Sequence, residues 1–288
     1  RFMDFYLLVL INGLAYAALL FLLASGLSLV YGVGRILHLA HGGFYMLGGY
    51  IGYTLIQSLE DFWWALVLVP LCALVVGWVA ERLVSLVYGP GRALEQVLFT
   101  FGLALVISDL SRFFWGAQVL GVAVPSALNR PVVLGPFVYP AYPLFLIGVG
   151  VLVALGLWGL LRFTSFGLQV RAAAGHPSMA EALGVPTRKV LQRTYLLGVA
   201  LAALAGFLGA PRIALAPGLD FTMLILALIV VVLGGLGSVT GAFYGAFLVG
   251  LVDSFGKALL PQFSLAMIFL IMVLVLILKP EGLLGGRR

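Results

Sequence analysis

Long apolar runs constrain this chain more than any other feature of its sequence. They occupy residues 5–31, 63–80, 97–115, 141–161, 190–210 and 264–278. A run of about 20 apolar residues is typical of a membrane-spanning helix, because a helix satisfies its own backbone polar groups in lipid. Hydrophobic residues form 63% of the sequence and charged residues 9%, which excludes an ordinary soluble domain. We therefore predict an all-α polytopic membrane protein, a single transmembrane domain over residues 1–288 with about 8–10 membrane helices.

The longest polar interruption covers residues 162–193 and contains five of the sixteen Lys and Arg residues against one acid, Glu181. Cytoplasmic loops are enriched in Lys and Arg, so we place this loop and the carboxyl end of the chain in the cytoplasm. Alternating the chain across the membrane from that loop puts eleven of the sixteen cations inside. The net charge of +6 is then a consequence of topology, and we expect no nucleic-acid partner.

The interior of loop 162–193 predicts a short helix over residues 178–183. Ser178 is placed to cap its amino end, Gly184 to end it, and Thr187 to cap the long helix that follows. Two interpretations remain open for this segment. It is either a docking element for a partner protein or a basic loop that only fixes the orientation of the chain.

Two Gly-X-Gly breaks interrupt apolar helices, one in each half of the chain. Residues 32–34 are followed by His-Gly-Gly-Phe-Tyr at 41–45, and residues 235–237 by Thr-Gly-Ala-Phe-Tyr at 240–244. Paired interruptions at corresponding places indicate a transport pathway in proteins that are built from repeats, and they predict broken or re-entrant helices. The alternative is convergence, because Gly-rich apolar segments resemble one another by composition.

Glycines also recur at helical spacing after both breaks. Gly237, Gly241 and Gly245 are four residues apart and predict one face of a helix, as do Gly48 and Gly52. Glycine faces let helix backbones approach closely. Tight packing explains each glycine by itself, whereas on the functional interpretation these helices enclose a path through the membrane.

Few side chains in the apolar runs could carry chemistry. His38 and His41 lie at the first break, but no acid or Cys is near enough in sequence to complete a metal site, so capping or interfacial roles are favoured. Asp253 and Lys257 are spaced to pair on one helix face, and we expect Cys72 to be a small core residue. We predict no enzyme, cofactor or metal. A transport protein without energy-coupling chemistry of its own is either a channel or is driven by a partner.

Four segments, in this order, resemble the permease subunits of bacterial branched-chain amino-acid ABC importers. They are LSLVYGVGRILHLAHGGFYMLGGY, RAAAGHPSMAEALGVPTRKV, VLGGLGSVTGAFYGAFLVG and KPEGLLGG, here called motifs 1 to 4. The resemblance covers essentially the whole chain. It implies a multi-pass protein of the bacterial inner membrane, in contact with lipid, whose partners are a second related permease (as a hetero- or homodimer), two cytoplasmic ATP-binding subunits and a periplasmic substrate-binding protein.

The resemblance also implies that residues 174–184 contain the helix that docks on the ATPase. Carried onto this sequence, the ATPase contacts are expected at Arg171, Ala174, Gly175, Met179, Ala180, Leu183 and Gly184. The translocation path, or the helix packing around it, is expected at His41, Gly42, Gly43, Gly48, Gly237, Gly241 and Gly245.

The implied function is ATP-driven import of branched-chain, aliphatic amino acids, with the binding protein docking on loops 116–140 and 211–220. The alternatives are an ABC permease for urea, amides or another small neutral solute, and a stand-alone channel or facilitator. The importer and the facilitator differ in whether residues 174–184 must touch another protein.

Overall fold

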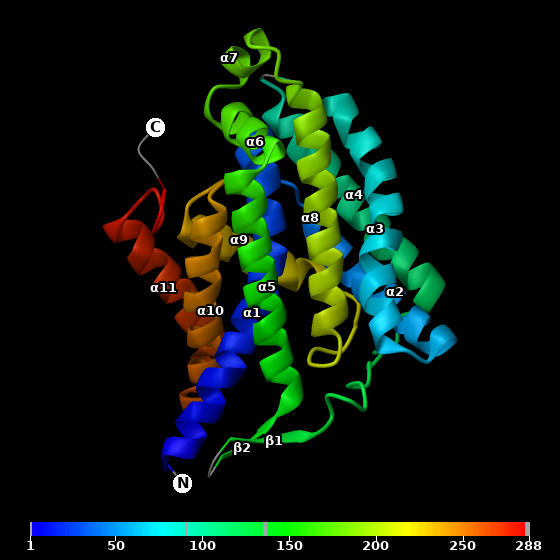
Figure 1. Ribbon diagram of the computed structural model, residues 1–288, viewed down its shortest axis with the longest axis vertical. Helices are drawn as coiled ribbons and strands as arrows, with labels where there is room; N and C mark the ends of the chain where they lie inside the picture. The colour runs from blue at the N-terminus through cyan, green and yellow to red at the C-terminus, as the bar shows by residue number, and fades with distance from the viewer. Residues whose placement is uncertain (1, 90, 135–136, 286–288) are drawn as a thin grey trace.

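The computed structural model describes residues 2–89, 91–134 and 137–285. Its longer helices are α1 (Phe2–Gly34), α2 (His41–Leu59), α3 (Phe62–Val84), α4 (Ala93–Trp115), α5 (Ala141–Phe163), α8 (Thr187–Gly209), α9 (Leu219–Gly234), α10 (Val239–Leu259) and α11 (Ser264–Leu278). The shorter helices are α6 (Ser165–Gly175), α7 (Pro177–Ala182) and the 3-10 turns η1 (Ser85–Val87) and η2 (Pro261–Phe263). Strands β1 (Pro131–Leu134) and β2 (Phe137–Pro140) form an antiparallel hairpin before α5. Figure 1 shows α6 and α7 at one end of the helix bundle, and the amino terminus and the hairpin at the other.

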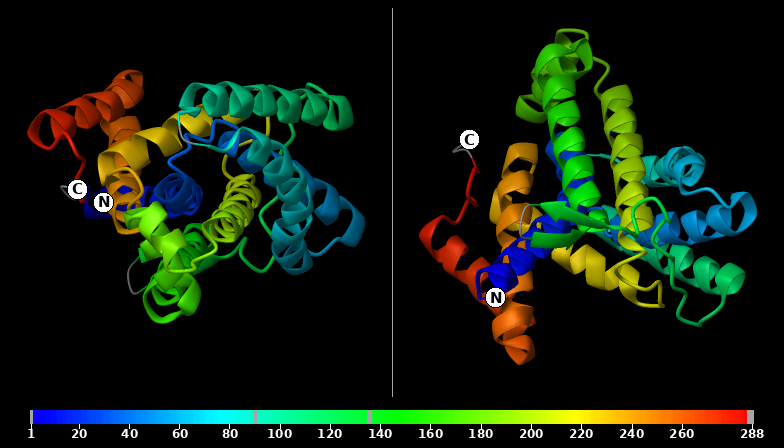
Figure 2. Two further views of the ribbon diagram at one scale, coloured as in Figure 1. Left: turned by 90° about the horizontal axis from the view of Figure 1, so that it is seen from above. Right: turned by 60° about the horizontal axis from the view of Figure 1, so that its bottom comes forward.

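Helix α1 forms the centre of the bundle. Helices α10, α8, α5 and α9 pack against it, and α2 and α3 pack in turn on α8 (Figure 2). Its sequence is apolar on every side, and such a helix is stable only when other elements surround it or lipid does. Leu22 and Ala24, near its middle, are completely buried. Small residues along α1 let its neighbours approach closely, as expected for helix packing in a membrane.

Within the described part of the chain, seven helical segments are long and apolar enough to cross a membrane. They are Asp4–Gly34, Phe62–Val87, Ala93–Trp115, Ala141–Phe163, Thr187–Gly209, Val239–Leu259 and Pro261–Leu278. Helices α2 and α9 lie among them. Because α9 has only 16 residues, it extends about 24 Å and does not cross a hydrocarbon core of about 30 Å. The chain is therefore a polytopic all-helical membrane protein, and the two additional helices adjoin the predicted breaks.

The second predicted break is present, but the first is displaced: Gly32 and Gly34 lie in the last turn of α1, and the interruption covers residues 35–40. Helix α1 ends at Gly34 and α2 begins at His41, while α9 ends at Gly234 and α10 begins at Val239. Gly237 therefore lies in the break, with a φ of 81°, and the prediction that it shares a helix face with Gly241 and Gly245 is wrong. Ser238 caps α10 by accepting a hydrogen bond from the backbone N–H of Gly241, and the helix starts only after it.

Two of the predicted caps in loop 162–193 are wrong. Helix α7 begins at Pro177, one residue before Ser178, because proline is favoured in the first turn, where its missing N–H is not needed. The Thr187 hydroxyl donates to the carboxylate of Glu181 instead of capping α8, which ties the two helices together. The predicted end of α7 is confirmed, since Gly184 has a φ of 83° and its N–H donates to the carbonyl of Glu181.

Two further predictions concern single side chains in the spans. Cys72 is exposed, so its assignment to the core is wrong: it lies beside, and not within, the face of α3 that buries Val69 and Ala73. The pairing of Asp253 with Lys257 is confirmed by a distance of 2.7 Å between the carboxylate Oδ2 and the ammonium Nζ. This ion pair lies near the end of α10 that adjoins η2, at the same end of the bundle as the β-hairpin (Figure 1).

Candidate functional site

The two glycine breaks touch each other. A Cβ atom added to Gly32 would lie 3.1 Å from the carbonyl oxygen of Gly237, and one added to Gly237 would lie 2.9 Å from the Cα of Gly32. Real Cβ atoms essentially never come closer than 3.0 Å to another heavy atom, so the backbones meet here as only glycines allow. Motif 1 and motif 3 thus form one contact where α1 ends and α10 is about to begin.

Motif 4 joins the same place. The backbone N–H groups of Leu283 and Leu284 donate to the carbonyls of Leu233 and Gly234, at 2.7 and 3.0 Å. The last carbonyls of a helix lack partners within the helix, and the carboxyl-terminal segment supplies them for α9. Gly282 has a φ of 83°, which lets the chain turn back against the break. The sequence offered no physical reason for motif 4, and this contact provides one.

Motif 2 and the two breaks line a common groove of about 900 Å³ between α1, α5, α6 and α10. Gly32 and Gly237 line it on one side, and Arg171 and Ala174 of α6 line it on the other. The Arg171 guanidinium also donates to the carbonyl of Leu161, which fastens α6 to the end of α5. The four motifs therefore gather at one end of the bundle, and α6 is the element that connects loop 162–193 with the two breaks.

Helix α7 projects beyond the end of the helix bundle (Figure 1). The side chain of Met179 is 62% exposed and that of Leu183 is 77% exposed, although both are apolar. Gly175 and Gly184 are exposed beside them. Ala180, in contrast, is 3% exposed and faces inward, so it holds α7 in place and offers no surface. Exposed apolar residues on a rigid projection are typical of an interaction surface.

A second, more polar cleft of about 680 Å³ lies between the end of α3 and the α7–α8 connection. Arg82, Arg188 and Lys189 line it together with two acids. One of those acids, Glu81, is 3% exposed and accepts a hydrogen bond from the Gln192 amide at 3.0 Å, which joins α3 to α8. These cations lie at the same end of the bundle as Arg162 and Arg171. The enrichment of cytoplasmic loops in Lys and Arg, used above to orient the chain, assumes such a grouping.

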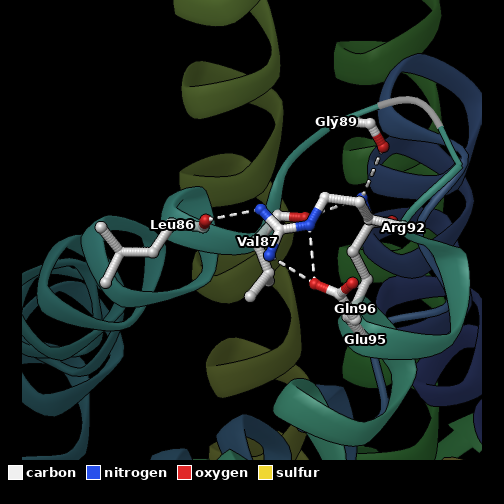
Figure 3. A network of polar contacts seen from close by, with 6 residues as sticks. All are labelled: Leu86, Val87, Gly89, Arg92, Glu95 and Gln96. Atoms are coloured by element: carbon white, nitrogen blue, oxygen red, sulfur yellow. Dashed lines mark hydrogen bonds and ion pairs between the residues drawn. The ribbon is translucent and has the colours of Figure 1, made fainter.

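Polar contacts fix the α3–α4 connection at this same end (Figure 3). The Nε of Arg92 donates to the carboxylate of Glu95 at 2.6 Å, and one terminal nitrogen donates to the carbonyl of Leu86 at 3.3 Å. The Gln96 amide donates to the carbonyl of Val87 at 3.1 Å. The carbonyls of Leu86 and Val87 in η1 are thus satisfied by the side chains of Arg92, which precedes α4, and Gln96 in its first turn.

The two histidines of motif 1 are core residues. His41 is 1% exposed, and its Nε2 lies 2.9 Å from the carbonyl oxygen of Leu23. His38 is equally buried, and its Nε2 lies 2.7 Å from the hydroxyl of Tyr195 on α8. This pair joins the connection between α1 and α2 to α8. Tyr195 was not predicted, because a single tyrosine in an apolar run carries no signal of its partner.

The remaining glycines predicted for the path or its packing are buried contacts between helices. Gly42 lies against the backbone of Asp220, Gly43 against Ile107, Gly48 against Ala203, Gly241 against Gly234 and Gly245 against Val230. Each of these positions leaves no room for a larger side chain without a shift of its neighbour. The structure thus brings α2 onto α8 and α9, and α10 onto α9, through glycines. This explains them as packing residues without testing whether they also border a path.

Asp220 is a buried carboxylate that sequence reasoning assigned to a short loop. It lies in the first turn of α9, is 2% exposed, and neither carboxylate oxygen has a hydrogen-bond partner within the described part of the chain. Acids in a membrane domain are costly and mark functional positions by default. Asp220 could have been noticed from the composition, because acids are almost absent from the apolar segments. It was overlooked because residues 211–220 were assigned to a loop, whereas α9 begins at Leu219.

Comparisons with known proteins identify the family of the chain. A family model described as "Branched-chain amino acid transport system / permease component" matches residues 9–278. The chain is 28% identical to the high-affinity branched-chain amino acid transport system permease protein LivH of Escherichia coli (strain K12), over 98% of this chain and 96% of that protein. It is 29% identical to the corresponding protein BraD of Pseudomonas aeruginosa, over 97% and 96%.

A third relative is the probable branched-chain amino acid transport permease protein LivH of Methanocaldococcus jannaschii, which is 26% identical over 96% of this chain and 92% of that protein. Motifs 1, 2 and 3 lie inside the residues that the family model matches, so the contact between the breaks and the projecting α7 both belong to the shared region. The chain is a member of the branched-chain amino-acid transport permease family.

Proposed function

We propose that this chain is the permease subunit of an ABC importer that passes branched-chain amino acids into the cytoplasm. One observation carries the proposal: α7 exposes Met179 and Leu183 on a projection whose supporting helix, α6, lines a groove together with both glycine breaks. A displacement of α7 can therefore be transmitted through α6 to the glycine breaks at the end of α1 and the start of α10. The permease itself contributes no chemistry to the energy supply, which we assign to two cytoplasmic ATP-binding subunits.

We propose the orientation from the distribution of Lys and Arg between the two ends of the bundle. The end that carries α6, α7 and the cations of loop 162–193 faces the cytoplasm, in agreement with the preference of cytoplasmic loops for Lys and Arg. The opposite end carries the β1–β2 hairpin and a bridge in which Leu120 and Leu215 exchange backbone hydrogen bonds of 2.9 and 2.8 Å. We assign loops 116–140 and 211–220 to the docking of a periplasmic binding protein.

The substrate class rests on the relatives. The proteins that this chain resembles over nearly its full length are described as branched-chain amino acid permeases, and the apolar interior suits an aliphatic side chain. The mechanism is alternating access: closure of the ATPases moves α7, and the helices rock about the glycine contacts. A second permease, either another copy or a relative, completes the path.

Cysteine crosslinking of α7 tests the proposal. Single cysteines replace residues 178–184 in a Cys72→Ala background, which is required because Cys72 is exposed. Membranes that contain the co-expressed candidate ATPases are treated with a short thiol crosslinker, with and without nucleotide. Crosslinks at Met179 and Leu183, but not at buried Ala180, are expected, with yields that change on addition of ATP.

The Ala180→Cys variant is the matched control, since it lies on the same helix and points inward. If no position crosslinks, while the purified chain alone passes leucine into liposomes, the importer proposal fails and the chain is a facilitator. If crosslinking succeeds but the assembled complex transports urea or an amide instead of leucine, the coupling assignment stands and the substrate assignment fails.

A further inference from the structure

The groove beside the glycine breaks continues along the membrane-spanning part of the molecule. A second cavity of about 140 Å³ lies further along α1 and shares Phe21 and Phe243 with the first. Helix α1 forms the floor, and α5 and α10 form the walls. The lining of the second cavity is entirely apolar. The two cavities together form a channel-like groove with a wide end and an apolar narrow end.

The cationic side chains that line the groove are all at its wide end. Arg162 and Arg171 line it, and among the described residues no acid lines either cavity. The guanidinium of Arg162 lies 5.8 Å from the centre of the Trp158 ring, and Trp beside Arg near the end of a membrane helix is typical of the membrane–water interface. Arg171 uses one nitrogen for the carbonyl of Leu161 and keeps the others for a ligand.

The amino end of α10 opens into the same space. Ser238 and Thr240 line the groove, and the first turn of this 21-residue helix offers hydroxyls and the positive end of the helix dipole to an anion. The Ser238 oxygen accepts from Gly241, so its own hydrogen is available to donate. Two arginines, two hydroxyls and a helix terminus line this groove, whereas the nearest acid at the α10 end, Glu281, lines a separate pocket on the other side of Ser238; the groove itself therefore suits an anion, and not the ammonium group of an amino acid.

We propose that this groove binds one anionic phospholipid. Its phosphate lies between Arg162, Arg171 and the first turn of α10, and one acyl chain follows α1 past Phe21 and Phe243 into the narrow cavity. The groove opens between helices whose outer faces are apolar, with Leu155 60% and Phe247 43% exposed, so a lipid reaches it sideways. A basic pocket between membrane helices at the cytoplasmic face is the kind of place where anionic headgroups bind.

Native mass spectrometry of the purified full chain tests the proposal. The probe is an equimolar mixture of phosphatidylglycerol and phosphatidylcholine with the same palmitoyl and oleoyl chains. We expect one phosphatidylglycerol molecule to be retained preferentially. Removal of one cation, in Arg162→Gln or Arg171→Gln, lowers that preference about fivefold, as estimated for one Lys or Arg beside an anionic lipid.

Two variants separate the site from general effects of charge. Arg188→Gln removes a cation at the same end of the bundle that does not line the groove, and it should leave the preference unchanged. Ala154→Phe fills the apolar wall without changing charge and should lower retention of both lipids. Equal loss of preference in Arg188→Gln and Arg162→Gln would overturn the site. So would disulfide-linked dimers formed through Leu155→Cys in the Cys72→Ala background, because a second copy would then occupy the groove.

Discussion

The crossing of α1 and α8 allows a quantitative prediction. A Cβ atom on Gly26 would lie 2.7 Å from the carbonyl oxygen of Gly198 and 2.9 Å from its Cα, in a fully buried contact between two helix backbones. The backbones would have to separate by about 0.7 Å to reach the 3.4 Å of ordinary contact. Neither atom belongs to a flexible side chain, so the strain cannot be relieved locally. Overpacking of this kind costs about 1–3 kcal/mol, against a gain of up to about 1 kcal/mol in helix propensity.

We therefore expect Gly26→Ala to lower the free energy of unfolding by about 1–2 kcal/mol, which corresponds to about 2–8 °C in Tm for a chain of this size. Gly102→Ala is the matched control, because Gly102 lies inside α4 with nothing within 4 Å of the added Cβ. It should leave Tm unchanged or raise it slightly. The assay is thermal unfolding of the detergent-purified chain, followed by the loss of the monodisperse peak in size-exclusion chromatography. Equal Tm values for the two variants would refute the inference that backbone contact at Gly26 holds α1 against α8.

Three further predictions concern the breaks, the ion pair and α7. Gly237→Ala places a side chain at a φ of 81° and against Gly32, and should cost about 1–3 kcal/mol in thermal unfolding; a wild-type Tm would contradict the contact. Lys257→Met leaves the Asp253 carboxylate, 12% exposed, without its partner and should cost about 1–3 kcal/mol, most of which the added change Asp253→Asn should restore. Leu183→Asp should leave Tm unchanged, since its side chain is 77% exposed, but should abolish co-purification of the ATPases; retained co-purification would exclude α7 as their docking site.

The sequence predicted the class of fold, the second break and an interruption close after the first Gly-X-Gly, because long apolar runs and Gly-X-Gly segments are local signals; it placed the first break at residues 32–34, which are helical, and not at residues 35–40. It also predicted the short helix in loop 162–193 and its end at Gly184. It could not predict that Gly32 meets Gly237, or that the carboxyl-terminal motif closes α9 through Leu233, since these contacts join segments far apart in the chain. Cys72 was misassigned because burial in a membrane helix depends on which side faces its neighbours, and α3 is apolar on both.

The residues of the candidate site also fall into those that a local sequence signal could predict and those that it could not. The exposed apolar residues of α7 could be anticipated from the short helix and its basic surroundings, and the resemblance to known permeases supplied their role. His38 and Tyr195 form a buried pair that no local pattern could reveal, because each residue alone has several structural explanations. Ala180 was expected on the docking surface and is instead buried, since a helix of six residues must turn one side toward the bundle to be held there.

Leucine uptake into proteoliposomes tests the central claim most directly. The chain is reconstituted alone, and then together with its candidate partner permease, ATPases and binding protein, with ATP enclosed. The account predicts no uptake by the chain alone, and ATP-dependent uptake by the complete assembly that Leu183→Asp abolishes. Equilibration of leucine by the chain alone, at a rate that ATP and the ATPases do not change, would contradict it.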